Sequence, residues 1–291
     1  MKGIILAGGL GTRLYPATLS VCKQLLPVYD KPMIFYPLSV LMLANIKDIL
    51  IISTKEDLPK FRKLLGNGEL LGIKISYATQ NKPRGLADAF LVGRKFIKKD
   101  NVCLILGDNL FYGDGLPSLL INSINYVKNK KKAIIFSYKV NNPSSYGIVK
   151  EKNNKIVSIV EKPKNSKLNN AVIGLYLYPN KVINLATKIK ISKRGELEIT
   201  DLNNLFLKEN KLELRKLGRG IAWFDTGSAE NLYEASQLIR IMEKRIGYKI
   251  GCLEEISLNK KWIRIKTYKK NIKKYEKSEY GKYLVEKLDE R

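Results

Sequence analysis

The sequence predicts an α/β fold: a Rossmann-like, mostly parallel central sheet flanked by helices, with an inserted smaller β-rich portion and a helical C-terminus. Three observations predict it. Short, continuously apolar segments alternate with helix-like segments, as in parallel sheets that are covered on both faces. A glycine-rich loop at residues 8–11 directly follows the first apolar segment. The 291 residues, 45% of them hydrophobic, suffice for one large α/β domain or two smaller ones.

The N-terminal part of the chain is expected to supply the parallel strands. Buried strands are predicted at residues 4–7, 48–53, 73–78 and 102–106, where most residues are apolar. Helices are predicted at 32–45, 56–65 and 85–97. Pro32 suits the first turn of its helix, because proline has no N–H to leave unpaired there.

The middle of the chain predicts shorter strands. They are expected at 132–140, 147–151, 156–161, 171–178, 212–217 and 222–224, with Asn153-Asn154 as a hairpin turn and a helix at 199–208. Ser228 is the expected N-cap of a helix that runs to about Arg245, with Glu230 in its first turn. The tail from Trp262 predicts one or two amphipathic helices.

The composition excludes several kinds of catalysis. The chain has no histidine, which excludes Ser-His-Asp and Cys-His catalysis and any His-ligated zinc site. A metal would be held by oxygen, which favours Mg²⁺ or a similar hard cation. A general base would be Asp, Glu, Lys or Tyr. Cys22, Cys103 and Cys252 lie far apart without metal-ligand spacing, as in a reduced, cytoplasmic protein.

The net charge of +26 raises the question of a polyanionic partner. The lysines are spread along the whole chain beside many Asn and Ile residues, and no nucleic-acid motif accompanies them. No apolar run reaches the roughly 18–20 residues of a membrane helix, and the N-terminus does not resemble a signal peptide. We therefore expect no specific nucleic acid and no membrane partner. A basic polyanion-binding protein without catalysis is the alternative from another functional class.

The glycine loop and two cations indicate a phosphate site. Backbone N–H groups in such a loop, and the helix N-terminus after it, both favour an anion. The loop lacks the spacing of a P-loop. Arg13 and Lys23 could neutralise a triphosphate and a leaving pyrophosphate. Either cation taken alone is more commonly a solvated surface charge.

Two aspartates follow buried strands. Asp108 comes after 102–106 and Asp225 after 222–224, and ligands of open α/β sheets bind beyond the carboxyl ends of strands. The pair could share one Mg²⁺ and a nucleotide phosphate, although a single Asp in such a place is commonly a turn or cap residue. The polar loop at 80–85 offers the Gln80 amide, which suits a base edge.

Read together, seven motifs resemble the sugar-nucleotide pyrophosphorylases, and closely the glucose-1-phosphate thymidylyltransferase family. They occur in order along most of the chain, and the second and sixth are the most specific: GGLGTRL (8–14), KQLLPVYDKPMI (23–34), LGDN (106–109), YGIV (146–149), EKP (161–163), RGELEITD (194–201) and WFDTG (223–227).

This resemblance implies a reaction and a set of site residues. The reaction makes dTDP-glucose and pyrophosphate from dTTP and α-D-glucose 1-phosphate with Mg²⁺, the first step towards dTDP-L-rhamnose. A uridylyl- or adenylyltransferase acting on another sugar 1-phosphate is the alternative. The implied catalytic residues are Arg13 and Lys23, and the implied metal ligands are Asp108 and Asp225. Implied nucleotide contacts are Leu6, Gly8, Gly11, Thr12, Gln24, Gln80 and Gly85. Implied sugar-phosphate contacts are Tyr146, Gly147, Glu161, Lys162, Val172 and Arg194.

The resemblance also implies an organisation. We expect a single nucleotidyltransferase domain over 1–291, with a nucleotide-binding part at about 1–130, a mainly sugar-binding part at 131–227 and a helical C-terminal part at 228–291. Family members are often homotetramers, so a homo-oligomer is expected.

Overall fold

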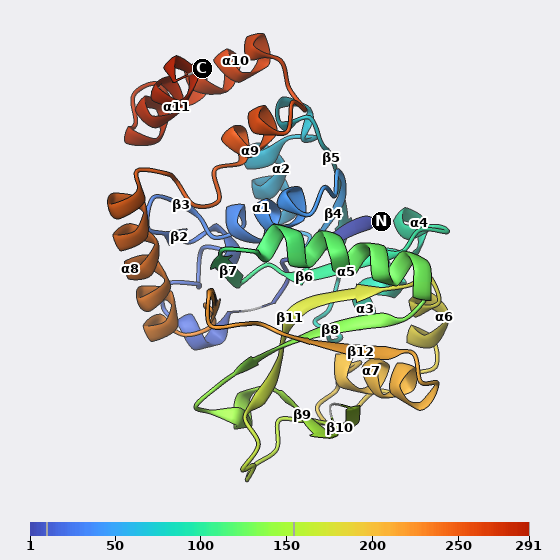
Figure 1. Ribbon diagram of the computed structural model, residues 1–291. Coiled ribbons are helices and arrows are strands. Elements are labelled where there is room, and N and C mark those ends of the chain that lie inside the picture. Colours follow the sequence, from blue (N-terminus) through green and yellow to red (C-terminus); the bar gives the residue numbers. More distant parts are fainter. Residues whose placement is uncertain (10, 154, 291) are drawn as a thin grey trace.

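The chain folds around one large mixed sheet (Figure 1). The computed structural model describes residues 1–9, 11–153 and 155–290, so Leu10, Asn154 and Arg291 lie outside the described residues. In this part of the chain, nine strands form the sheet in the order β10-β9-β11-β6-β1-β4-β5, with β8 beside β11 and β12 beside β8. Their bounds are β1 Lys2–Leu6, β4 Asp48–Ser53, β5 Lys74–Thr79, β6 Val102–Leu106, β8 Ala133–Lys139, β9 Gly147–Lys152, β10 Lys155–Glu161, β11 Asn170–Tyr178 and β12 Leu212–Lys216.

The N-terminal strands are parallel, as predicted. Strand β1 pairs in parallel with β4 and with β6, and β4 pairs in parallel with β5. Strand β11 runs antiparallel to β6, β8 and β9 and so joins the later strands to this core. Strands β9 and β10 are antiparallel, as a hairpin requires, and Asn154 of the predicted turn lies outside the described residues. All carboxyl ends of the parallel core therefore open at one edge, beside the later, β-rich portion.

Helices cover both faces of the sheet, because successive residues of a buried strand point to opposite sides. Ile5 belongs to the same buried cluster as Phe35 and Phe61 on one face, and Ile4 to the same cluster as Phe90 and Phe206 on the other. The first face is covered by α1 (Phe35–Leu43), α2 (Leu58–Leu65) and α5 (Leu116–Lys130), and the second by α3 (Asp88–Val92), α4 (Arg94–Ile97), α6 (Val182–Ala186) and α7 (Ile199–Lys208).

Two sequence predictions need correction. Pro32 does not begin a helix. It lies in β3 (Lys31–Pro32) and pairs with β2 (Pro27–Val28), since Met33 and Ile34 donate back to the carbonyls of Leu26 and Gln24. The helix predicted at 85–97 is two short helices that meet at Gly93. A Cβ there would lie 2.9 Å from the Ala89 carbonyl oxygen. Helices α5 and α6 were not predicted.

The C-terminal residues are helical. Helix α8 (Ala229–Ile246) begins at the predicted cap, where Ser228 Oγ accepts from the Asn231 N–H at 3.2 Å. It follows β13 (Ile221–Asp225), which pairs with β7 (Asn109–Gly113) in a separate small sheet. Helix α9 (Leu253–Asn259), which was not predicted, packs on α1. Helices α10 (Ile265–Tyr275) and α11 (Glu279–Asp289) pack together at the end of the molecule opposite β9 and β10 (Figure 1).

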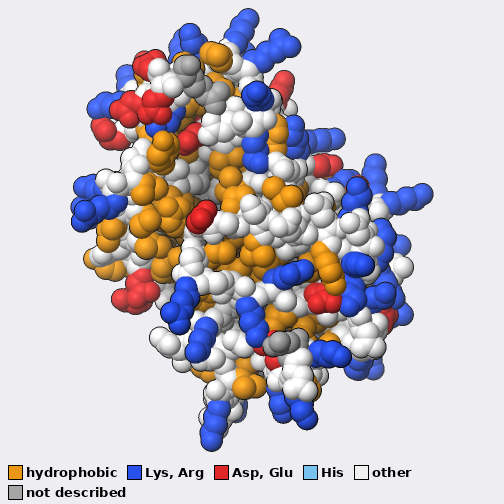
Figure 2. All heavy atoms as spheres, in the orientation of Figure 1, with side chains coloured by type: hydrophobic (Ala, Val, Ile, Leu, Met, Phe, Trp, Pro, Cys, Tyr) orange, Lys and Arg blue, Asp and Glu red, His pale blue; other side chains and the backbone are white. Residues whose placement is uncertain are grey.

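Among the described residues, four short 3₁₀ helices connect these elements: Thr12–Leu14, Lys23–Leu25, Glu69–Leu71 and Pro143–Ser145. Of the helices in the described residues, none combines the length and the hydropathy that crossing a bilayer would require. Lys and Arg side chains stand out along much of the outline of the face in Figure 2, most densely on the right. Such a field attracts polyanions without sequence preference, mainly at low salt.

Candidate active site

The pairing of two short strands brings Asp108 and Asp225 together. Asp225 ends β13, and the antiparallel register places it opposite Asn109, the first residue of β7. The Thr226 N–H and hydroxyl both donate to the Asp108 carbonyl, at 3.0 and 2.7 Å. Both carboxylates line a pocket of about 270 Å³ at the carboxyl end of β6. The two aspartates predicted from separate motifs therefore share one site.

Asp108 is held as an anion by its neighbours. Lys23 forms an ion pair with Oδ2, and Asn109 Nδ2 donates to Oδ1 at 3.0 Å. Burial disfavours the charge of Asp108, but the charge and hydrogen bond of Lys23 outweigh this effect, so the pKa of Asp108 lies below its ordinary value.

Asp225 has the opposite balance. Burial and the adjacent Asp108 carboxylate raise its pKa, and Lys23 and Arg13 offset the increase only in part. Burial and the charge of Asp225 in turn raise the pKa of Tyr146 to about 12. The site thus holds two neighbouring carboxylates whose charges are incompletely compensated.

This donor set fits a hard divalent cation. Two carboxylates are oxygen ligands of the kind Mg²⁺ binds, and Mg²⁺ takes its other ligands from water and substrate phosphates. No group of three or more His, Cys, Asp or Glu residues is placed to hold a metal within the described ranges. A metal bound by Asp108 and Asp225 would therefore depend on the substrate for part of its coordination.

Arg13 reaches the same pocket from the glycine loop. Gly9 and Gly11 have φ of 131° and 60°, which favours glycine, and the Thr18 hydroxyl donates to the Gly11 carbonyl at 2.8 Å. A Cβ at Gly227 would overlap the Arg13 guanidinium and lie 2.9 Å from Asp225 Oδ1. The absence of a side chain at Gly227 therefore lets Arg13 approach the carboxylates.

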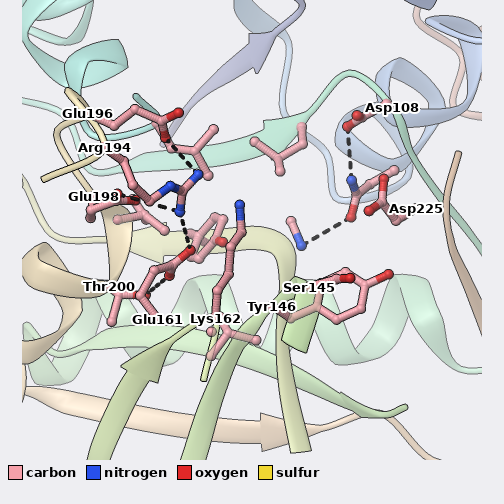
Figure 3. A pocket seen from close by; sticks show the side chains of 18 of the residues that line it. Asp108, Ser145, Tyr146, Glu161, Lys162, Arg194, Glu196, Glu198, Thr200 and Asp225 are labelled. Carbon is pink, nitrogen blue, oxygen red and sulfur yellow. Dashed lines mark hydrogen bonds and ion pairs between the residues drawn. The ribbon is translucent and has the colours of Figure 1, made fainter. Parts of the chain in front are cut away.

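A second group of charged side chains lies across the pocket (Figure 3). Glu161 Oε2 accepts from the Thr200 hydroxyl at 2.5 Å, and Glu161 Oε1 lies 3.4 Å from Arg194 Nη1. Arg194 also pairs with Glu196 at 3.5 Å and Glu198 at 3.6 Å. Figure 3 shows Lys162 between this group and the two aspartates, with its side chain pointing into the pocket.

Most of the residues predicted to act in catalysis, hold the metal or contact the sugar phosphate line this pocket. Arg13, Asp108, Tyr146, Gly147, Glu161, Lys162, Val172, Arg194 and Asp225 do so. Lys23 does not line it but contacts it through Asp108.

The residues predicted to contact the nucleotide do not line this pocket. Gly85 packs against the Leu197 backbone, and Gly8 lies beside Gln80. Gln24 is buried and accepts from the Cys22 thiol at 3.0 Å. Leu6 ends β1, and Gly11 and Thr12 belong to the glycine loop and the 3₁₀ turn after it.

Asn109 and Trp223 are site residues that received no role from the sequence. Asn109 is 3% exposed, and its Oδ1 accepts from the Gly174 N–H at 3.1 Å and from Trp223 Nε1 at 2.7 Å. These bonds fix the amide so that Nδ2 faces Asp108. Both residues lie within motifs singled out from the sequence, but their contacts connect β7, β11 and β13, which are distant in the chain.

Known proteins match the chain over most of its length. The model of the family described as nucleotidyl transferase matches residues 2–241. A glucose-1-phosphate thymidylyltransferase of Neisseria meningitidis is 49% identical over 289 residues, 99% of each chain. The enzyme of that name from Mycobacterium tuberculosis is 48% identical over 290 residues, again 99% of each chain.

Solved structures share the fold. A candidate glucose-1-phosphate thymidylyltransferase from Bacillus anthracis, in complex with sucrose, superposes with a TM-score of 0.76 at 40% identity, covering 82% of this chain and 95% of that one. A UDP-glucose pyrophosphorylase complexed with UDP-glucose has a TM-score of 0.72 at 26% identity, covering 83% and 98%.

Proposed function

We infer, from the premise that this chain belongs to the nucleotidyl transferase family and within it to the glucose-1-phosphate thymidylyltransferases, that it makes dTDP-glucose and pyrophosphate from dTTP and α-D-glucose 1-phosphate. The observation that carries the inference is the convergence of Arg13, Lys23, Asp108 and Asp225 at one pocket. Two cations beside two carboxylates suit a reaction between a triphosphate and a phosphate monoester.

The proposed chemistry is one in-line displacement. A phosphate oxygen of glucose 1-phosphate forms a bond to the α-phosphorus of dTTP, while the bond from that phosphorus to the bridging oxygen breaks and pyrophosphate leaves. The attacking oxygen of a phosphate monoester is already an anion, so no side chain must remove a proton. Positioning and charge stabilisation are what the protein supplies.

We assign the cations to the triphosphate. Arg13, which approaches Asp225 across Gly227, and Lys23, which is paired with Asp108, would offset the negative charge that develops on the α-phosphate and the leaving group. Asp108 and Asp225 would hold Mg²⁺. When bound, this ion supplies charge neutralisation on the phosphate oxygens and lowers the repulsion met by the attacking anion.

We assign the opposite side of the pocket to glucose 1-phosphate. Glu161 offers carboxylate oxygens to sugar hydroxyls, with its orientation fixed by Thr200. Lys162 and Arg194 are the cations assigned to the phosphate of this sugar, and Tyr146, Gly147 and Val172 line the same pocket. Leu6, Gly8, Gly11, Thr12, Gln24, Gln80 and Gly85 are assigned to the nucleotide.

We also propose the wider organisation. The 291 residues form one nucleotidyltransferase domain with nucleotide-binding, sugar-binding and C-terminal parts, and the chain assembles as a homo-oligomer in the cytoplasm. Light scattering of the purified protein gives its mass in solution. A monomeric mass at micromolar concentration would remove the oligomer from the proposal.

Product analysis tests the proposed reaction. The purified protein, incubated with dTTP, glucose 1-phosphate and Mg²⁺, is expected to form dTDP-glucose and pyrophosphate in equal amounts. With the Sp α-thio analogue of dTTP, a single in-line displacement inverts the configuration at phosphorus. Retention would contradict the direct displacement, and the absence of dTDP-glucose would contradict the reaction itself.

A further inference from the structure

We propose that Asp88 sets the base preference of the nucleotide site by fixing the side-chain amide of Gln80 in one orientation. The proposal rests on the function proposed above, in which Gln80 contacts the base of the nucleotide. Asp88 is therefore a positioning residue that acts through Gln80. It selects a base that carries a hydrogen-bond donor at N3, as thymine and uracil do, against cytosine, which has an acceptor there.

Gln80 and Asp88 form a buried pair at the edge of the nucleotide side. Gln80 follows β5, and its backbone N–H donates to the Ser53 carbonyl at 2.9 Å. Asp88 is the first residue of α3. The two side chains belong to residues that are 8% and 4% exposed, so their polar atoms need partners within the protein.

Both hydrogens of the Gln80 amide nitrogen are engaged. Nε2 donates to Asp88 Oδ2 at 2.9 Å and to the Gly85 carbonyl at 3.4 Å. A side-chain amide has only two N–H donors. Gln80 therefore has no N–H left to offer to a nucleotide.

The opposite orientation of the amide is disfavoured. Rotating it by half a turn would place Gln80 Oε1 against a carboxylate oxygen of Asp88 and against the Gly85 carbonyl, where no atom could donate. Buried acceptors left without a donor cost free energy. Arg84 Nη2 lies 3.7 Å from Asp88 Oδ1, whereas Gln80 bonds the other oxygen, Oδ2.

What Gln80 presents to a ligand is its carbonyl oxygen. Oε1 accepts no hydrogen bond from any residue that the structure describes, and a Cβ at Gly8 would lie 3.5 Å from it. It thus lies beside the glycine loop. Thymine has one N–H donor on its base-pairing edge, N3–H, flanked by two carbonyls. An acceptor-only Gln80 that contacts this edge must contact N3–H.

The same oxygen repels cytosine. In cytosine, N3 carries a lone pair, so the same pose would face two acceptors toward each other. A site built around one hydrogen bond rejects an analogue that cannot make it. Uracil carries the same N3–H as thymine, so the fixed orientation of the Gln80 amide does not distinguish dTTP from UTP. We call this fixed pair of Gln80 and Asp88 the lock.

The Asp88→Asn substitution is expected to release the lock. Arg84, which donates only, favours the orientation in which the substituted amide turns its carbonyl towards the guanidinium and its NH₂ towards Gln80. Gln80 can then reverse, opposed only by the 3.4 Å contact with the Gly85 carbonyl, and present its own NH₂ to the base, which suits N3 of cytosine. The nearly identical shape of the two side chains favours normal folding. Asp88→Ala is a second variant, in which the Gln80 amide keeps only the Gly85 carbonyl and can rotate.

The readout is the ratio of kcat/KM for dTTP to that for dCTP, measured on one preparation of each protein. Partial unfolding lowers both values equally and leaves the ratio unchanged. We expect this ratio to fall at least about tenfold in Asp88→Asn, with the same direction in Asp88→Ala. Arg84→Met is the matched control: it removes the exposed partner, keeps the bond between Asp88 and Gln80, and should leave the ratio near that of the unmodified enzyme.

The outcomes separate this inference from the proposed function. If the unmodified enzyme makes dTDP-glucose but neither Asp88 variant changes the ratio, the lock is wrong and the function stands. If the ratio falls equally in Arg84→Met, the effect belongs to the loop rather than to Asp88, and the lock is again wrong. If the unmodified enzyme makes no dTDP-glucose, the proposed function fails and this inference fails with it.

Discussion

Lys23 Nζ forms an ion pair with Asp108 Oδ2, and the two side chains are only 12% and 16% exposed. The pair joins the 3₁₀ turn Lys23–Leu25 to the short connection between β6 and β7. Lys23 therefore faces a carboxylate of the proposed metal site as well as the expected position of the triphosphate. Its charge helps to keep Asp108 ionised, so a change at Lys23 should affect both stability and turnover.

Replacing Lys23 by Met should lower both the stability of the protein and its turnover. The largely buried Asp108 loses its cation, which is expected to cost about 3 kcal/mol of unfolding free energy, and kcat should fall at least ~100-fold. The Lys23→Met/Asp108→Asn double variant should recover stability but not turnover. Urea unfolding and steady-state kinetics measure the two effects. A rise in the KM for glucose 1-phosphate alone would contradict the assigned role.

Replacing Asp225 by Asn should abolish turnover without weakening the fold. The charge of Asp225 is disfavoured by burial and by Asp108, so its loss relieves repulsion while kcat falls at least ~100-fold. Binding of Mn²⁺, used as a spectroscopic probe, should weaken at least about tenfold. Asp114→Asn, in an exposed turn, is the control. Unchanged Mn²⁺ binding in Asp225→Asn would remove Asp225 from the metal site.

Glu254 should make the stability of the protein depend on pH. Burial raises its pKa above the ordinary value of 4.5, so the folded state binds this proton more tightly than the unfolded state. The resulting stability is present below pH 4.5 and is lost as the pH rises through the raised value. Glu254→Gln keeps an acceptor for the Tyr280 hydroxyl, which donates to Glu254 at 2.6 Å. The variant should therefore gain stability relative to the unmodified protein between pH 4.5 and neutrality.

Urea midpoints of both proteins across this range test the prediction. Groups shared by the two proteins cancel in the difference, and Glu276→Gln, at an exposed position, controls for net charge. A difference that does not vary with pH would show that Glu254 does not titrate differently on folding.

Two serine caps allow stability to be separated from activity. Ser228 caps α8 beside the site, and Ser278 caps α11, each through a backbone N–H at 3.2 and 3.1 Å respectively. Replacing either with Ala should cost about 1 kcal/mol in chemical denaturation. Asn231, in the first turn of α8, donates to the Asp225 carbonyl at 2.8 Å, so only Ser228→Ala should also reduce kcat. Equal kinetic loss in Ser278→Ala would refute this distinction.

The fold was predictable where local pattern decides it. Four of the six residues at 48–53 and all five at 102–106 are apolar, and both strands occur where expected. Helix α5 was missed although Leu116, Leu120 and Val127 repeat at helical spacing and are buried. Pro32 suited a helix start, but the backbone bonds from Met33 and Ile34 to the earlier turn place it in a hairpin. At Pro32, pairing with the strand at Pro27–Val28 therefore overrides the local preference for a helix start.

The site was predictable as residue types but not as contacts. Asp108 and Asp225 each follow a buried strand, which located both, yet their proximity depends on the β7–β13 ladder, and β7 was not predicted. The ion pair between Lys23 and Asp108 and the bond from Gln80 to Asp88 likewise depend on how distant segments pack. No spacing rule in the sequence encodes such contacts.

A competition reaction tests the central claim most directly. The purified protein is given dTTP, UTP, dCTP and ATP at equal concentrations with glucose 1-phosphate and Mg²⁺, and the nucleotide sugars are quantified by chromatography at early times. We predict that dTDP-glucose is the major product and that its formation stops when Mg²⁺ is chelated. Formation of UDP-glucose or ADP-glucose about tenfold faster than dTDP-glucose would contradict the account.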